Sequence, residues 1–180
     1  MKEAIDFARK HFSKYNKSSK PVLKHSINVG RKLSKLNYPI ETVRVGILHD
    51  VIEDSNCKIS EIESKFGEKV AHLVSALSYN SNITDPIERH RDLIQRIVKA
   101  GKEAMIIKVI DNMDNLPYVD KIKDLKKRNL VIKKHLFTIK SFERFLKDDP
   151  MFRKYKSKVN LFQDPEITTC RIYENNGGDN

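Results

Sequence analysis

The sequence predicts an all-α fold, and three observations lead to this prediction. Apolar residues recur at steps of three and four along nearly every segment, which is the spacing of an amphipathic helix. Prolines stand between these segments, where they mark the starts and ends of helices. No segment alternates apolar and polar residues for long enough to predict a strand. The chain is therefore expected to consist of helices joined by short connections.

Five helices are predicted before residue 81. The first segment is amphipathic, and the second opens with Pro21, a residue that suits the first position of a helix. Pro39 breaks the chain before a third, strongly apolar segment. A short helix and a longer helix are then joined at Phe66-Gly67. The predicted ranges are 3–15, 21–36, 40–53, 59–65 and 67–80.

Three further helices are predicted in the rest of the chain. The polar run 79–84 is expected to be a loop, after which Pro86 opens a helix that Gly101 closes. Pro117 interrupts or ends the next helix, and Pro150 ends the last one. The predicted ranges are 86–100, 103–115 and about 121–147.

Length and composition limit the class of protein. A chain of 180 residues is long enough for one domain with a real core, and 39% apolar residues argue against disorder although 33% are charged. No apolar run approaches the ~18 residues that a membrane span needs, and the N-terminus has no signal-peptide core. Cys57 and Cys170 lie far apart and indicate neither a disulfide framework nor a CxxC metal site. We expect a soluble cytoplasmic protein without a membrane partner.

The formal net charge of +11 is concentrated in one stretch of the sequence. Residues 121–158 carry 14 Lys and Arg against 4 Asp and Glu, whereas residues 1–120 have a net charge of only +4 and residues 159–180 one of −3. The basic stretch has a helical apolar pattern at Leu125, Ile132, Leu136, Ile139 and Phe142. A solvated lysine-rich helix face is the favoured interpretation, and a field that attracts an anionic partner is the alternative.

The string Leu48-His-Asp-Val-Ile-Glu-Asp54 is the most informative part of the sequence. A His-Asp pair within an apolar segment is unusual, because buried polar groups are costly unless they are paired or bound to a metal. In a helix, His49 and Glu53 are four residues apart, as are Asp50 and Asp54, so all four side chains share one or two adjacent stripes. These acids repel one another unless a cation or a shared proton balances them.

Two residues on other predicted helices complete a candidate metal site. His25 lies in the second helix, and Asp111 follows the apolar run Met105–Ile110. With His49 and Asp50 they form a set of two imidazoles and two carboxylates, which suits Mn²⁺, Fe²⁺ or Zn²⁺ and leaves positions for water and a substrate oxygen. Each residue alone has a simpler explanation, such as a capping histidine or an acid on a wet helix face. The joint pattern favours a metal.

This pattern resembles a known family. His25, the pair His49-Asp50 and Asp111 match the H…HD…D signature of the HD-domain phosphohydrolase superfamily. The run from Phe66 to Val74 (FGEKVAHLV) and the string from Lys108 to Asn115 are similar to one branch of it. That branch comprises the RelA/SpoT hydrolase domain and the stand-alone small alarmone hydrolases.

The resemblance covers about residues 3–120 and implies a domain organisation. It implies a single HD-type hydrolase domain over 1–158, built as an HD helical bundle with additional basic C-terminal helices over 121–158. Residues 159–180 are then a C-terminal extension that ends in a flexible tail. It makes no prediction of the oligomeric state.

The resemblance also implies an activity. Members of the branch are Mn²⁺-dependent hydrolases that remove the 3′-pyrophosphate from guanosine tetra- or pentaphosphate (ppGpp or pppGpp), so the expected partner is a small phosphorylated nucleotide. Carried over by position, Glu53 and Asp54 orient and activate the attacking water, and Lys17 and Asn115 line the nucleotide site. The implied metal ligands are His25, His49, Asp50 and Asp111. Further substrate-binding candidates are Lys20, Arg91, Lys108 and Tyr118.

Several positions depart from the pattern of the branch and keep two alternatives open. Where relatives usually have Arg, Gly, Tyr, Arg, His and Thr, this chain has Asn16, Ser19, Val22, Asn112, Asp114 and Tyr118. Because an Arg that stacks on a base is not replaced by Asn without a change in recognition, the substrate is alternatively an adenine alarmone, NADPH or a deoxynucleotide. The second alternative is a non-enzymatic basic helical protein that binds nucleic acid. It is disfavoured, because interleaved aromatics are missing and the His/Asp/Glu set is intact.

Overall fold

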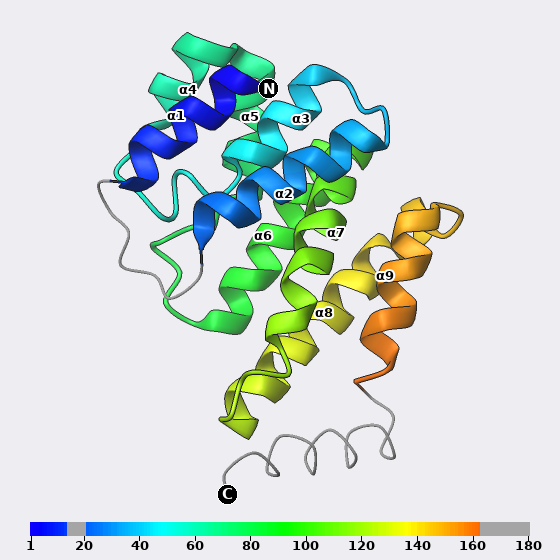
Figure 1. Cartoon of the computed structure of the whole chain (residues 1–180). Coiled ribbons are helices and arrows are strands. Elements are labelled where there is room, and N and C mark those ends of the chain that lie inside the picture. Colours follow the sequence, from blue (N-terminus) through cyan, green and yellow to red (C-terminus); the bar gives the residue numbers. More distant parts are fainter. Residues whose placement is uncertain (14–20, 163–180) are drawn as a thin grey trace, which may run out of the picture. The chain divides into compact units, whose positions relative to one another are not determined.

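The computed structural model describes residues 1–13 and 21–162, and every regular element in these ranges is helical (Figure 1). This confirms the predicted all-α fold. The helices are α1 (Lys2–Ser13), α2 (Val22–Lys35), α3 (Ile40–Leu48), α4 (Ile59–Phe66), α5 (Glu68–Leu77), α6 (Pro86–Ala100), α7 (Lys102–Asn115), α8 (Leu125–Leu146) and α9 (Pro150–Asn160), with a short 3₁₀ helix at Leu116–Tyr118. No helix in the described ranges is both long enough and apolar enough to cross a bilayer.

The chain divides into two compact units, Met1–Asp114 and Asn115–Asn180. The first unit holds α1 to α6 and all of α7 except its last residue, and the second holds the 3₁₀ helix, α8 and α9. The proposed metal ligands all lie in the first unit.

The core of the first unit is built around a close crossing of α2 and α3. A side-chain carbon at Gly30 would overlap Ile47, and one at Gly46 would overlap Leu33. Because glycine lacks these atoms, the two helix backbones approach closely, and the side chains around the crossing, such as Val29, Leu33 and Ile47, are buried. α7, which carries Asp111, is largely buried as well. His25 lies on α2, and His49 and Asp50 directly follow α3.

Two helix ends differ from the prediction. α3 ends at Leu48 rather than at residue 53, and α5 ends at Leu77 rather than at residue 80. After α3 the chain turns: the Val51 amide donates to the Leu48 carbonyl, and the Ser55 hydroxyl bonds the carbonyl of Val51.

The second unit contains a helix that the sequence analysis did not separate. Pro150 was predicted to end a helix, but it begins α9, where Asp149 caps the N-terminus by accepting hydrogen bonds from the Met151 and Phe152 amides. α8 begins at Leu125 behind the cap Asp124, later than residue 121. The sequence does mark both helix starts, because Asp is favoured as the residue before a helix, as Asp124 and Asp149 are here. Pro150 also occupies the first position of α9, where Pro is favoured.

The apolar face of α8 also differs from the predicted one. Leu125 is 62% exposed, whereas Ile139 and Phe142 are buried. Within the unit, α8 packs against α9, and the buried His135 ring and Tyr155 hydroxyl lie 2.8 Å apart. The predicted C-terminal extension 159–180 lies mostly outside the described residues, and its predicted flexible tail lies entirely outside them.

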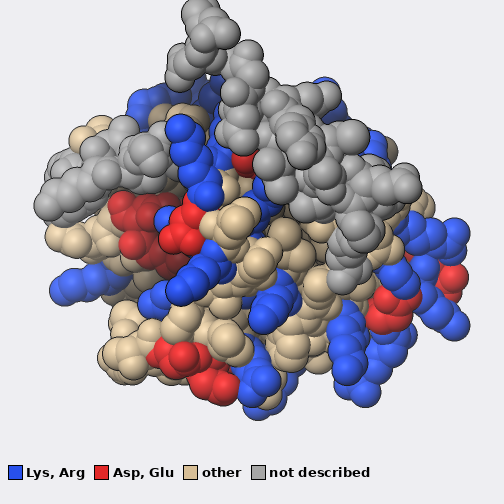
Figure 2. Space-filling model, turned by 90° about the horizontal axis from the view of Figure 1, so that it is seen from below, with Lys and Arg blue, Asp and Glu red and all other residues tan. Residues whose placement is uncertain are grey.

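Charged side chains of the second unit are partly paired. Three ion pairs join basic to acidic residues at distances of 2.9 to 3.1 Å: Arg128–Asp120, Lys156–Glu143 and Arg153–Asp148. On the face of the molecule in Figure 2, Lys and Arg are interspersed with Asp, Glu and uncharged residues. Both interpretations of the basic stretch, a solvated face and a field that attracts an anionic partner, stay predictions.

Candidate active site

Two buried imidazoles meet where α2, the end of α3 and α7 come together. His25 lies on α2, and His49 directly follows the last residue of α3. Each is only 3% exposed, and their ring centroids lie 5.3 Å apart. Histidines buried this deeply need partners for both ring nitrogens, because an unpaired buried polar atom is costly.

The outer nitrogen of each ring has a fixed acceptor. His25 Nδ1 donates to Asp114 Oδ2 at 2.8 Å, and His49 Nδ1 donates to the Gly46 carbonyl at 2.8 Å. These bonds fix the tautomer, so each Nε2 presents a lone pair toward the other helix. The buried Nε2 of His49 has no hydrogen-bond partner. Metal-binding histidines are typically oriented in this way by a carboxylate or a carbonyl on the outer nitrogen.

Two carboxylates face the same point as the Nε2 atoms. Asp111 Oδ1 lies 3.0 Å from His25 Nε2 and 3.5 Å from His49 Nε2. Asp50 oxygens lie 3.2 Å from His49 Nε2 and 3.6 Å from His25 Nε2. Lone pairs and carboxylate oxygens repel at such distances unless a proton or a cation lies between them. His25, His49 and Asp111 each offer one ligand atom, and these three atoms lie within 4.8 Å of one another. The residues present therefore fit a divalent metal of the first transition row.

The electrostatics of His49 support the same conclusion. Burial by itself lowers its pKa, but the negative charges of Asp50 and Asp111 outweigh burial and raise the pKa to about 9. Without a cation, a proton on His49 therefore offsets the neighbouring acids. A divalent cation supplies the same positive charge and leaves the ring neutral, which is the form that binds metals.

Lys108 holds the second oxygen of Asp111. Its ammonium donates to Asp111 Oδ2 at 2.8 Å, three residues away on α7. Burial opposes ionisation of both groups, but their attraction raises the pKa of Lys108 and keeps the pKa of Asp111 well below its usual range. Asp111 is thus charged, with Oδ1 left toward the imidazoles. The structure places Lys108, a predicted substrate-binding residue, beside the cluster and paired with an acid.

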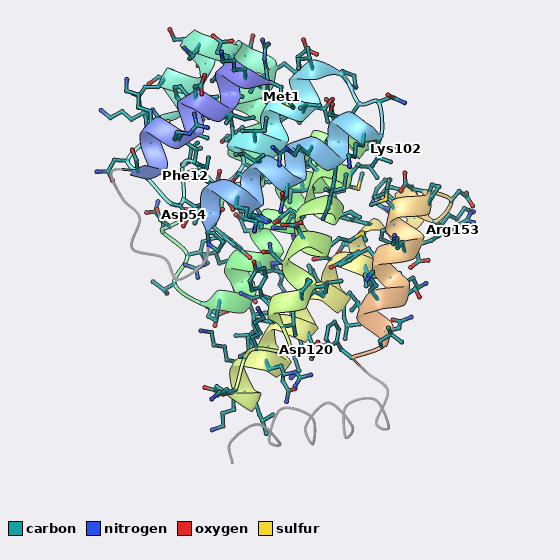
Figure 3. All side chains as sticks on the ribbon, viewed as in Figure 1. Met1, Phe12, Asp54, Lys102, Asp120 and Arg153 are labelled. Atoms are coloured by element: carbon teal, nitrogen blue, oxygen red, sulfur yellow. The ribbon has the colours of Figure 1, made fainter. Side chains whose placement is uncertain are left out.

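Glu53 lies next to this cluster on the turn after α3. Its residue surface is exposed, but Oε1 accepts a hydrogen bond from the Tyr79 amide at 2.8 Å. Desolvation of the carboxylate and the nearby charge of Asp50 raise the pKa of Glu53 to about 7, although the Tyr79 bond and Lys108 oppose this rise. A carboxylate with this pKa can accept and release a proton near neutral pH. Asp54, the other predicted water-activating residue, is exposed in the same turn (Figure 3).

The other predicted substrate-binding residues fall outside the described ranges, on α6, or in the second unit. Lys17 and Lys20 fall outside the described residues, as do the departures Asn16 and Ser19. Arg91 is an exposed residue of α6 whose guanidinium pairs with Glu88 at 2.9 Å. Asn115 and Tyr118 belong to the second unit.

The sequence analysis missed three residues that orient the cluster. Asp114 and Lys32 form a pair at 2.6 Å beside His25, and the Tyr79 amide orients Glu53. The sequence marks Asp114 in one respect, because it is an acid at a position where relatives usually have His. A backbone amide 26 residues from its acceptor leaves no trace in the sequence.

Comparison with known proteins agrees with this geometry. The sequence profile described as HD domain matches residues 4–138. The chain belongs to the HD domain family. The predicted membership of this family is therefore confirmed.

Relatives of this HD domain protein include named hydrolases. It is 29% identical over 134 residues to guanosine-3′,5′-bis(diphosphate) 3′-pyrophosphohydrolase of Aquifex aeolicus, a match that covers 72% of this chain and 19% of the relative. It is 30% identical over 119 residues to the human protein of that name, MESH1, covering 63% of this chain and 66% of the relative. The chain thus spans about a fifth of the length of the first relative and about two thirds of the second.

Solved structures share the fold of this HD domain. The crystal structure of lmo0812 from Listeria monocytogenes has a TM-score of 0.70 and 25% identity, covering 82% of this chain and all of that one. A metazoan ortholog of SpoT, described as hydrolysing ppGpp, has a TM-score of 0.72 at 21% identity, covering 89% of this chain and 92% of that one. The second likeness shows the fold alone.

We expect Asp114→Asn to weaken metal binding by this HD domain by about 10- to 100-fold, because outer carboxylates that hold ligand histidines have effects of this size. The variant keeps the shape of the residue but removes the charge that accepts from His25 and pairs with Lys32. The measurement is the Mn²⁺ concentration that gives half-maximal activity, with kcat at saturating Mn²⁺ nearly unchanged. Asp6→Asn, in an exposed surface pair with Arg9, is the matched control. Equal Mn²⁺ requirements in both variants contradict the assigned role.

Proposed function

We propose that the chain is a metal-dependent pyrophosphohydrolase that acts in the cytoplasm and removes the 3′-pyrophosphate from guanosine tetra- or pentaphosphate. One observation carries the proposal: His25, His49, Asp50 and Asp111 converge on one point beside Glu53, a carboxylate with a pKa of about 7. Two relatives that carry the name of this activity, one bacterial and one human, support it.

In this proposal the four converging side chains hold one Mn²⁺. When bound, the ion supplies Lewis acidity that lowers the pKa of a water and offsets phosphate charge. The protein fixes the ligands in advance, because Asp114 and Gly46 orient the two imidazoles and Lys108 fixes Asp111. Phosphoryl transfer depends mostly on such positioning and charge stabilisation.

Glu53 accepts the proton of the attacking water. Its Oε1 is held by the Tyr79 amide, which leaves Oε2 for the water. The oxygen of the water forms a bond to phosphorus, the bond from phosphorus to the 3′ oxygen breaks, and that oxygen takes a proton. The products are pyrophosphate and a nucleoside diphosphate when the substrate is the tetraphosphate. Asp54 is proposed to orient the same water.

A second candidate substrate class has support from Asn112. This residue is 7% exposed on α7, where the branch has an Arg. A neutral amide here lacks the charge and the planar set of donors of a guanidinium, so a change in nucleotide recognition is expected. The same hydrolytic chemistry on an adenine alarmone, NADPH or a deoxynucleotide is therefore the alternative.

The test is a substrate panel with the full-length protein and Mn²⁺. We expect release of one pyrophosphate and one GDP per guanosine tetraphosphate, with slower turnover of the adenine analogue, NADPH and deoxynucleoside triphosphates. Faster turnover of one of these three identifies the alternative substrate class. Failure to hydrolyse any of them, with the metal bound, contradicts the proposed function.

A further inference from the structure

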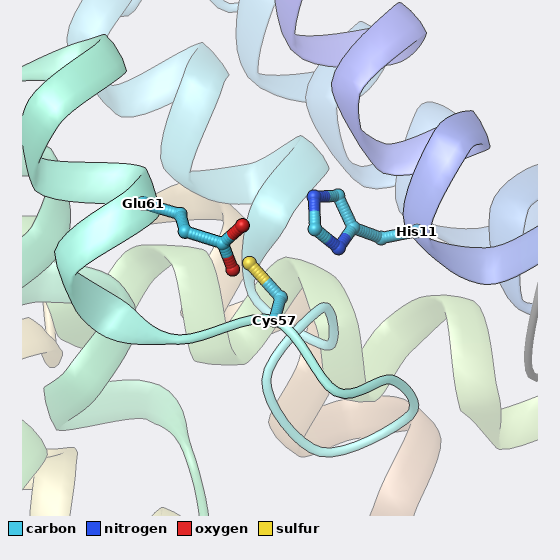
Figure 4. Close-up of side chains that lie close together, drawn as sticks. All are labelled: His11, Cys57 and Glu61. Carbon is cyan, nitrogen blue, oxygen red and sulfur yellow. The ribbon is translucent and has the colours of Figure 1, made fainter.

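We propose a second divalent-cation site, of the kind that binds Zn²⁺, formed by His11, Cys57 and Glu61 (Figure 4). It lies in the first unit and shares no residue with the cluster around His25 and His49. It is therefore independent of the proposed hydrolase activity.

Three separate elements bring these side chains together. His11 comes from the last turn of α1, Cys57 from the loop after α3, and Glu61 from the first turn of α4. Figure 4 shows the imidazole, the sulfur and the carboxylate directed toward one another. One ligand atom of each residue lies within 4.8 Å of the others. Distances of about 2.3 Å for Zn–S and about 2.0 Å for Zn–N place tetrahedral ligands about 3.5 Å apart, so small side-chain rotations complete the site.

The neighbouring structure fixes each of the three groups. The His11 ring packs on Phe7, with centroids 4.4 Å apart. The Lys58 amide donates to Glu61 Oε2 at 2.9 Å, so the carboxylate is held in place. Cys57 is 5% exposed, whereas Glu61 is exposed, so the site has one buried ligand and an open side. Preorganised ligands of this kind lose little entropy when they bind an ion.

The chemistry of the three groups selects the class of ion. Burial and the adjacent Glu61 carboxylate raise the pKa of the Cys57 thiol to about 12, so without a cation the sulfur keeps its proton. A cation that favours thiolate displaces this proton, so at a pH below the thiol pKa its affinity increases about tenfold for each unit by which the pH is raised. One sulfur, one imidazole and one carboxylate form a mixed set that suits Zn²⁺ and leaves a fourth position for water. Mg²⁺ and Ca²⁺ prefer oxygen ligands alone.

A cation here ties the N-terminal helix to the rest of the first unit. It joins α1 to the start of α4 and to the loop that follows the HD pair. We therefore expect bound Zn²⁺ to raise the melting temperature of the protein in a concentration-dependent way.

The experiment is a Co²⁺ titration of the full-length protein, reduced with a thiol-free phosphine and observed by near-ultraviolet absorption. Co²⁺ bound to a thiolate gives a charge-transfer band, and the first cluster offers only histidine and aspartate ligands. We expect this band in the wild type and in Cys170→Ser at one thiolate-bound ion per chain, and its removal by Zn²⁺. We expect no band in Cys57→Ser.

Two further variants keep the test decisive if Cys57→Ser does not fold. His11→Asn and Glu61→Gln change partly or fully exposed side chains, and Gln retains the helix-capping contact. Each is expected to weaken Co²⁺ binding by at least about tenfold, as loss of one of three ligands removes more than 1.4 kcal/mol. The proposal is overturned if the wild type gives no band, if Cys170→Ser loses it, or if both of these variants bind Co²⁺ as the wild type does.

Discussion

Replacing Asp50 by alanine is expected to reduce pyrophosphate release from guanosine tetraphosphate by at least about 10³-fold, or about 4 kcal/mol in transition-state stabilisation. Asp50 oxygens lie within 3.6 Å of both His25 Nε2 and His49 Nε2, so the variant loses one of four groups that face the metal position. The bound metal should fall in parallel. Metal content by elemental analysis and turnover at several Mn²⁺ concentrations are the measurements.

The control for this variant is Asp6→Ala, which removes an exposed acid from a surface pair with Arg9. It is expected to keep both the metal and the activity, because surface pairs contribute little. If Asp50→Ala retains wild-type turnover, the assignment of the metal ligands is wrong. If it retains the metal but not turnover, Asp50 acts on the substrate instead.

Glu53→Gln is expected to lower kcat by about 10²- to 10⁴-fold while the metal stays bound, because general bases contribute factors of this size. The base works in its charged form, whose fraction increases as the pH rises through its pKa of about 7. A bound cation lowers this pKa. At saturating Mn²⁺, we therefore expect wild-type kcat to decrease about tenfold for each pH unit below the pKa of Glu53, which lies at or below 7 when the cation is bound. This decrease is the acid limb of the pH profile.

The pH profile separates this role from a structural one. In Glu53→Gln the limb assigned to Glu53 should be missing from the residual activity, whereas Glu88→Gln, a change at an exposed helix residue, should keep it. A Glu53→Gln enzyme with reduced activity but an unchanged acid limb rules out Glu53 as the proton acceptor.

The sequence was informative about residue types and spacing, and less so about backbone path. The His-Asp pair and the distant His25 and Asp111 stand out because polar groups inside apolar helices need a reason. The argument from a continuous helix over 40–53 was wrong, because α3 ends at Leu48. His49, Asp50 and Glu53 still come together, because the turn after α3 keeps residues that are close in sequence close in space.

Contacts between distant segments could not be predicted. The Tyr79 amide and the His11–Cys57–Glu61 group depend on how loops close on helices, and neither follows a local period. α9 was missed for a different reason, since Pro150 was taken as a terminator although Asp149 before it is a favoured cap. Attention to the residue before each proline would have separated α8 from α9.

The two lysines beside the cluster compensate only part of its negative charge. Four carboxylates surround the imidazoles, namely Asp50, Glu53, Asp111 and Asp114. Lys108 and Lys32 each compensate one of them and a proton on His49 compensates a third, so one negative charge remains at a pH where Glu53 is charged. A polyphosphate that approaches the site before the metal meets this excess negative charge, whereas a divalent cation cancels it. We therefore expect the proposed substrate to bind after the metal, in an ordered rather than a random addition.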